Sequence, residues 1–131
     1  MKESKLAYDY FTVDYDIALE HFFKPKSMKL FIQRLAQFYF YTGEKIKAVY
    51  YRPSANGHVH IKIMLKHKHN ILELIIYRAY FYDDAYRIRA DLRRYFMDKD
   101  GEVMILWDKK TYILPDKTTV KKAGKWKRLY P

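Results

Sequence analysis

The sequence predicts a single α+β domain in which helices cover one face of an antiparallel β-sheet. The chain has 131 residues, of which 50% are hydrophobic, and this suits one core rather than two. Several segments alternate between apolar and polar residues, as strands do, and segments with helical periodicity separate them. Cysteine is absent, which excludes a disulfide framework and a thiolate metal site.

The first predicted strand covers residues 8–16, which are rich in aromatic and β-branched side chains. Its period of two places Phe11 and Val13 on the face toward the core. The opposite face then carries Tyr10, Thr12, Asp14 and Asp16.

A helix and a hairpin follow this strand. Ser27 is the predicted N-cap of the helix, which ends at Gly43. The apolar stripe of the helix consists of Met28, Phe31, Ile32, Leu35 and Tyr39. Residues 46–52 and 58–66 are predicted strands, joined by a turn at 53–57 with typical Pro, Asn and Gly residues. The second arm directs Val59, Ile61, Ile63 and Leu65 to the core, and His58, His60, Lys62 and Lys66 to the other face.

The second half of the chain contains the second helical region. Asn70 and Glu73 form a capping-box pattern, which predicts a helix over 71–82. Asp84 is the predicted N-cap of a further helical piece. Its inward side chains are expected to be Ala85, Ile88, Leu92 and Phe96, and its solvated ones Arg87, Arg89, Arg93 and Arg94. Short strands are predicted at 103–107 and 112–114.

This order of elements, βαββαβ, predicts a ferredoxin-like fold with two helices on one face of the sheet. In that plan the strand order is four, one, three, two, so the first and third strands are antiparallel neighbours. We therefore expect Asp14 and Asp16 to lie beside His58 and His60 on the open face. Two carboxylates and two imidazoles are suitable ligands for a divalent metal such as Mg²⁺ or Mn²⁺.

The charge of the chain indicates a polyanionic partner. Lys and Arg total 26 against 15 Asp and Glu, which gives a net charge of +11. From Lys109 onward there are eight Lys or Arg and one Asp, so this segment carries +7 of the net charge. We predict that residues 1–108 form the core and that residues 109–131 form a short strand and a partly ordered basic tail. The expected nucleic-acid contacts are Tyr10, Lys62, Arg87, Arg89, Arg93, Arg94, Lys121, Lys122, Lys125, Lys127 and Arg128.

No apolar run long enough to span a membrane and no signal peptide are predicted. We therefore expect a protein of the host cell interior with no membrane partner. The absence of Cys and the low content of Asn and Gln favour a heat-stable protein.

Two motifs resemble those of archaeo-eukaryotic primases and primase-polymerases. Asp14-Tyr15-Asp16 ends the first strand, and Ser54-Ala55-Asn56-Gly57-His58-Val59-His60 enters a later one. The resemblance implies an RRM-like sheet, metal bound at an acidic pair, and contact of a Ser-x-His motif with nucleotide phosphates. It assigns catalytic roles to Asp14, Asp16 and His60, and metal binding to Asp14, Asp16, His58 and His60.

Asp83-Asp84-Ala85-Tyr86-Arg87 is also similar to a segment of small proteins from archaeal viruses and plasmids. This likeness implies a role in the replication of such an element. The chain is shorter than a primase-polymerase and lacks a zinc-binding motif. The third carboxylate is unassigned, because Asp108 follows an apolar strand whereas a fourth strand beside the first would bring Glu102 nearer to the site.

Two other functions remain open on the same residues. His58-Val59-His60 resembles the His-hydrophobic-His strand of rolling-circle initiators, which implies a metal-dependent nickase with a nucleophilic tyrosine. Its candidate nucleophiles are Tyr77, Tyr80, Tyr82 and Tyr86. Alternatively, an open sheet face binds single-stranded DNA or RNA by stacking and charge alone, without catalysis.

Overall fold

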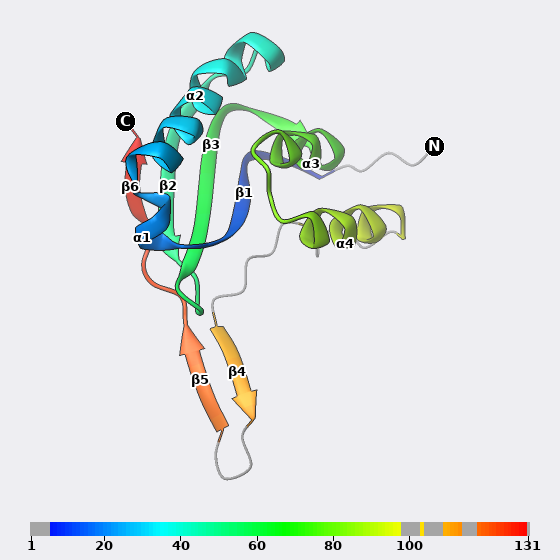
Figure 1. Ribbon diagram of the computed structural model, residues 1–131. Helices are drawn as coiled ribbons and strands as arrows, with labels where there is room; N and C mark the ends of the chain where they lie inside the picture. The colour runs from blue at the N-terminus through cyan, green and yellow to red at the C-terminus, as the bar shows by residue number, and fades with distance from the viewer. Residues whose placement is uncertain (1–5, 98–102, 104–108, 114–117, 131) are drawn as a thin grey trace.

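The structure, a computed structural model, describes residues 6–97, 103, 109–113 and 118–130 (Figure 1). Its elements are β1 (Ala7–Ala18), α1 (Leu19–Phe22), α2 (Pro25–Thr42), β2 (Ile46–Pro53), β3 (His58–Asn70), α3 (Ile71–Tyr80), α4 (Ala85–Phe96), β4 (Lys109–Ile113), β5 (Thr118–Lys122) and β6 (Lys127–Tyr130). The predicted α+β class with an antiparallel sheet is confirmed.

The main sheet has four strands in the order β1-β3-β2-β6, and β4 pairs with β5 in a separate two-stranded sheet. The prediction that the first and third strands are neighbours is confirmed, with Asp14 opposite His60. Residues 127–130, which the sequence assigned to a basic tail, form β6 and pair with β2.

The position of the fourth strand differs from the predicted order. β6 lies beside β2, at the edge of the sheet away from β1. At Asp14 the free edge of β1 is already hydrogen-bonded, because the backbone N–H of Asp14 donates to Asp83 Oδ1 over 2.7 Å and the N–H of Asp84 donates to the Asp14 carbonyl over 3.2 Å. This segment therefore holds the place that the predicted order gave to a strand. Of the strand predicted at 103–107, the structure describes only Val103, a buried turn residue.

The core lies between the sheet and the helices α2 and α3. Phe38 of α2 and Tyr77 of α3 contact each other at 5.1 Å between ring centres, and both rings lie about 6 Å from Phe11 of β1. Both helices therefore cover the same face of the sheet. The predicted inward residues of β3 are all buried: Val59, Ile61, Ile63 and Leu65.

The predicted N-caps of α3 and α4 are confirmed, whereas α3 ends at Tyr80 rather than at residue 82 and the start of α2 differs. The Asn70 side chain accepts from the Glu73 N–H, and Asp84 accepts from the N–H groups of Tyr86 and Arg87, as predicted. However, α2 begins at Pro25 rather than after Ser27, because a proline at the first helical position has the required φ and no N–H to satisfy. Gly43 ends this helix in the left-handed conformation, at φ 72°.

In α4, Phe96 is 64% exposed rather than inward, and Tyr95 is buried in its place. No helix among the described residues is long and apolar enough to cross a membrane.

Candidate nucleic-acid interface

The face of the sheet opposite α2 and α3 carries polar and aromatic side chains in cross-strand rows. One row contains Asp14, His60 and Arg52, and the adjacent row contains Thr12, Lys62, Tyr50 and Arg128. Because side chains alternate along each strand, all of these residues belong to the outer face.

Trp126 lies over the outer face among cationic side chains. Its ring centre is 4.4 Å from Arg52 Cζ, 5.1 Å from Lys62 Nζ and 6.5 Å from the His60 ring centre. The preceding segment is held at the end of β2 by a hydrogen bond from the Gly124 N–H to the Pro53 carbonyl over 2.9 Å. A Cβ at residue 124 would lie 2.5 Å from Pro53 Cγ, so only glycine permits this close approach.

Two more aromatic–cation pairs extend this arrangement toward both sheet edges. Lys62 Nζ also lies 5.4 Å from the Tyr10 ring centre, and Arg128 Cζ lies 5.8 Å from that of Tyr50. Burial, with the nearby Tyr8 and Asp9, raises the pKa of Tyr10, so its phenol stays neutral. We call Tyr10, Tyr50, Arg52, Lys62, Trp126 and Arg128 the outer-face platform. Arg52 is buried, at 6% exposure, so the positive charge open to a ligand comes from Lys62 and Arg128. The platform thus offers aromatic surfaces and positive charge together, which is the combination that binds unpaired bases and their phosphates.

A cavity of about 420 Å³ adjoins the platform at one end of the outer face. β1, β3, the turn at 54–56 and α4 line it. Its charged and titratable side chains include Asp14, Asp16, His58, His60, Arg87 and Arg94. The four residues predicted to converge from the ends of β1 and β3 are therefore brought together.

Within this cavity the carboxylates and imidazoles are arranged as two pairs. His58 Nδ1 lies 2.9 Å from Asp16 Oδ1, and His60 Nε2 lies 3.8 Å from Asp14 Oδ1. Arg52 Nε donates to His60 Nδ1 over 2.9 Å. Because arginine only donates, His60 is held as the tautomer that accepts at Nδ1 and carries its proton on Nε2, toward Asp14.

These side chains are of the types that bind a divalent metal, but they are not placed to bind one together. Carboxylate oxygens and imidazole nitrogens suit a divalent cation. Yet the described part of the chain holds no group of three or more Asp, Glu, His or Cys placed to bind one. Arg52 also takes one nitrogen of His60. Glu102 and Asp108, considered as the third carboxylate, lie outside the described residues.

No protein family, curated protein or solved structure matches this chain. The site must therefore be interpreted from its own chemistry.

The arginines of α4 divide into two groups. Arg89 and Arg93 are exposed, as predicted. The expectation that Arg87 is solvated was wrong: its side chain is 11% exposed and its Nη1 donates to Asp83 Oδ2 and to the Thr12 carbonyl, each over 2.9 Å. Its Nη2 donates to Thr12 Oγ1. Burial and the charge of Arg78 lower the pKa of Arg87, and Asp83 opposes this shift. Arg87 therefore fixes α4 against β1.

Arg94 is intermediate in exposure: its side chain is 40% exposed, and its Nη1 donates to Asp91 Oδ1 over 2.8 Å. Of the candidate basic contacts near the C-terminus, Lys122, Lys125, Lys127 and Arg128 are exposed, and Lys121 lies in β5. Of the candidate tyrosine nucleophiles, Tyr86 lines the cavity, whereas the Tyr77 hydroxyl lies 3.4 Å from His69 Nδ1.

Sequence reasoning missed Arg52 and Trp126. Arg52 occupies an alternating position on β2, which would have placed it on the outer face with Tyr50. Trp126 gave no comparable signal, because its position depends on the contact between Gly124 and Pro53.

Proposed function

We propose that this protein binds single-stranded nucleic acid across the outer-face platform. The observation that carries the proposal is the chain of aromatic–cation pairs that runs from Tyr10 through Lys62 and Trp126 to Arg52. Arg128 over Tyr50 continues it to the edge strand β6. Base stacking on such rings is tolerant of sequence, because every base has a π-face.

The charge of the chain supports the same function. A net charge of +11 attracts any polyanion, and the exposed Lys122, Lys125 and Lys127 adjoin the platform in sequence. Phosphates of a strand lying on the platform would be neutralised by these side chains with release of counterions.

A second candidate function is a nucleotide- or phosphate-processing centre in the cavity. It is supported by the convergence of Asp14, Asp16, His58 and His60 there. By its resemblance to primase-polymerases, such a centre would use Mg²⁺ or Mn²⁺ and would act in replicating a viral or plasmid element inside the host cell. In this proposal β1 to α4 form a ferredoxin-like, RRM-like core, since their order and the arrangement β1-β3-β2 agree with that plan.

The binding proposal is tested with Trp126→Ala and a matched aromatic control, Tyr41→Ala. Tyr41 is 72% exposed on α2, away from the outer face. Fluorescence anisotropy with a labelled unstructured oligonucleotide, as DNA and as RNA, should show Trp126→Ala weaker than the native chain by about 5- to 150-fold, the value of one stacked base. Tyr41→Ala should bind like the native chain. Equal affinities for all three proteins would contradict binding on the platform.

A further inference from the structure

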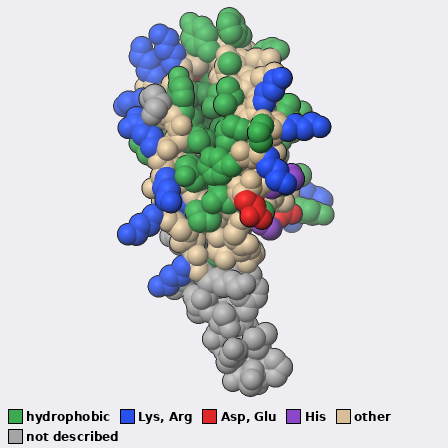
Figure 2. All heavy atoms as spheres, turned by 60° about the vertical axis from the view of Figure 1, so that its left-hand side comes forward, with side chains coloured by type: hydrophobic (Ala, Val, Ile, Leu, Met, Phe, Trp, Pro, Cys, Tyr) green, Lys and Arg blue, Asp and Glu red, His purple; other side chains and the backbone are tan. Residues whose placement is uncertain are grey.

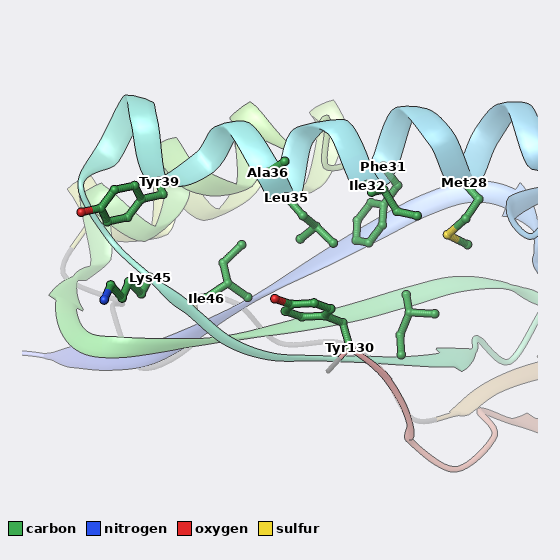
Figure 3. A pocket seen from close by; sticks show the side chains of 10 residues that line it. Met28, Phe31, Ile32, Leu35, Ala36, Tyr39, Lys45, Ile46 and Tyr130 are labelled. Atoms are coloured by element: carbon green, nitrogen blue, oxygen red, sulfur yellow. The ribbon is translucent and has the colours of Figure 1, made fainter.

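An apolar groove separates α2 from the edge of the sheet at β2 and β6 (Figure 3). Its volume is about 510 Å³, and its walls include Met28, Ile32, Leu35 and Tyr39 on one side, with Ile46 and Tyr130 on the other. The groove lies on the helix-covered side of the sheet, between α2 and the edge formed by β2 and β6. On β6, Leu129 is partly buried against the core, whereas Tyr130 is 51% exposed. A helix laid alongside α2 would occupy this groove.

The sequence of α2 has the spacing of a helix–helix seam along the groove. Met28, Ile32, Leu35 and Tyr39 follow one another at intervals of four, three and four residues, the repeat by which two helices pack side by side. The same helix packs on the core through the buried Phe31 and Phe38, and Met28 and Leu35 of the seam are also partly buried against that core. Ile32 and Tyr39 are the exposed members of the seam. Ala36 lies beside the seam, and a small side chain there allows a second helix to approach closely.

The exposed apolar surface along this seam is large for a monomer. Ile32 is 54% exposed, Tyr39 50% and Tyr130 51%. Phe40, 84% exposed, does not line the groove but extends this surface through its ring contact with Tyr39 at 6.2 Å. The three aromatic side chains alone offer about 400 Å², whereas monomers rarely expose a contiguous apolar patch above a few hundred Å². With the aliphatic residues of the seam, the patch approaches the roughly 800 Å² per partner that a stable interface needs.

The groove itself is nearly uncharged, although the rest of the chain is basic. Lys45, at one end, is the one charged residue that lines the groove as the structure describes it, and α2 contains no acidic residue. Figure 2 shows hydrophobic side chains in a band along this side of the molecule, with Lys and Arg on both flanks. A second copy would meet the rest of this +11 surface with repulsion, but across the uncharged seam it brings few like charges together.

We propose that the chain forms a two-fold symmetric dimer in which α2 of each copy packs along the α2 groove of the other. A two-fold interface pairs the same surface of both copies. Here the apolar residues of α2 in each copy would pack into the groove of the other copy and also line the groove that receives its partner's α2. Such a dimer leaves both outer-face platforms free, on the opposite side of each sheet. This inference does not depend on the proposed nucleic-acid binding.

The test is sedimentation velocity of the full chain over low to high micromolar concentration, after nuclease treatment. The native chain should sediment as a dimer at the higher concentrations. Ile32→Glu and Ala36→Glu should shift it to monomer, because each places a charge in the apolar seam. Leu30→Glu is the matched control: Leu30 is 58% exposed on the same helix but does not line the groove, and this variant should remain dimeric. Circular dichroism verifies that all variants are folded.

The salt dependence of dimerisation distinguishes an apolar interface from an electrostatic one. Raising the salt concentration screens repulsion between two +11 chains, so a dimer through the seam should become tighter. Association that weakens with salt, a monomer at every concentration, or a Leu30→Glu chain that dissociates as readily as Ile32→Glu would each overturn the proposal. A monomer whose groove binds a different protein would be such a result.

Discussion

Arg78 Nε donates to Asp83 Oδ2 over 2.8 Å, with both side chains fully buried. The same guanidinium donates from Nη1 to Asp91 Oδ2 over 2.7 Å, and the other oxygen of Asp83 accepts the backbone N–H of Asp14. Two ion pairs thus join α3 to the segment before α4 and to α4 itself, and the hydrogen bond from Asp14 links them to β1. The position of α4 over the cavity depends on this buried network.

Replacing Arg78 should therefore destabilise the fold strongly. Arg78→Met keeps most of the side-chain volume but removes the cation that the two buried carboxylates share. Because Asp83 keeps Arg87 and Asp91 keeps Arg94, the expected cost is at the lower end of the about 3–5 kcal/mol typical of breaking a buried ion pair. Urea unfolding followed by circular dichroism measures this. Arg89→Met, on the exposed side of α4, should change the free energy of unfolding by about 0.5 kcal/mol or less. Similar losses for the two variants would show that the network contributes little.

The register of β3 makes a second prediction about stability. Ile61 is fully buried, so Ile61→Ala should cost about 2–5 kcal/mol through lost transfer energy and a cavity. The sequence places His60 on the open face of the sheet, which predicts a small cost for His60→Ala. The structure changes that expectation, because His60 is 5% exposed and accepts from Arg52. Removing the imidazole leaves the buried Arg52 Nε without this acceptor, which should lower the free energy of unfolding by about 1–3 kcal/mol. A His60→Ala chain as stable as the native one in urea would contradict the Arg52–His60 hydrogen bond.

The sequence was most informative where periodicity alone decides the structure. The alternation from Val59 to Leu65 fixed which side of β3 is buried, and the order of elements then placed Asp14 beside His60. It was least informative where one long-range contact decides the outcome. The hydrogen bonds of Asp83 and Asp84 close the edge of β1 at Asp14, and neither has a local signature.

The same limit applies to burial of charged residues. An arginine on a helix is usually solvated, so Arg87 was expected to be exposed. Its burial depends on Asp83 and Thr12, which are brought to it by the tertiary fold.

A cluster at the far end of β3 predicts a pH dependence of stability. Burial alone would raise the pKa of Glu44, but hydrogen bonds from His69, His67 and two backbone amides lower it to about 2. Burial would lower the pKa of His69, yet its bonds to Glu44, at 2.5 Å, and to Glu73, at 2.8 Å, raise it above the ordinary 6.5.

The stabilisation from Glu44 is complete above its ordinary value of 4.5 and is lost as the pH falls toward about 2. The stabilisation from His69 is complete below 6.5 and is lost as the pH rises through its raised value. The native melting temperature should therefore be highest between these limits. In His69→Gln the decline on the alkaline side should be smaller, while His21→Gln, an exposed histidine, should follow the native profile. Parallel profiles for all three chains would exclude His69 as the titrating group.

The basic C-terminal segment should contribute to the salt dependence of nucleic-acid binding. Deleting it would also remove β6, so substitution is the appropriate change. Lys121, Lys122 and Lys125 replaced together by Gln should reduce the slope of log K against log salt by about 0.7 for each phosphate that is no longer neutralised. The matched triple Lys24→Gln, Lys26→Gln and Lys68→Gln removes the same charge elsewhere. If both triples lower the slope equally, the segment acts only through net charge.

The last prediction concerns the second candidate function, a metal-dependent centre at Asp14 and Asp16. A cation that binds only the folded chain raises its melting temperature by mass action. Millimolar Mn²⁺ or Mg²⁺, alone and with a nucleoside triphosphate, should therefore raise the native melting temperature if the two Asp–His pairs rearrange around a metal. Asp14→Asn together with Asp16→Asn should abolish the rise, while Asp9→Asn together with Glu20→Gln, which removes the same charge outside the cavity, should retain it. Because the outer-face platform does not include these carboxylates, the first double variant should still bind single-stranded nucleic acid. If neither metal changes the native melting temperature, even with nucleotide, the catalytic candidates fail and binding on the platform stands by itself.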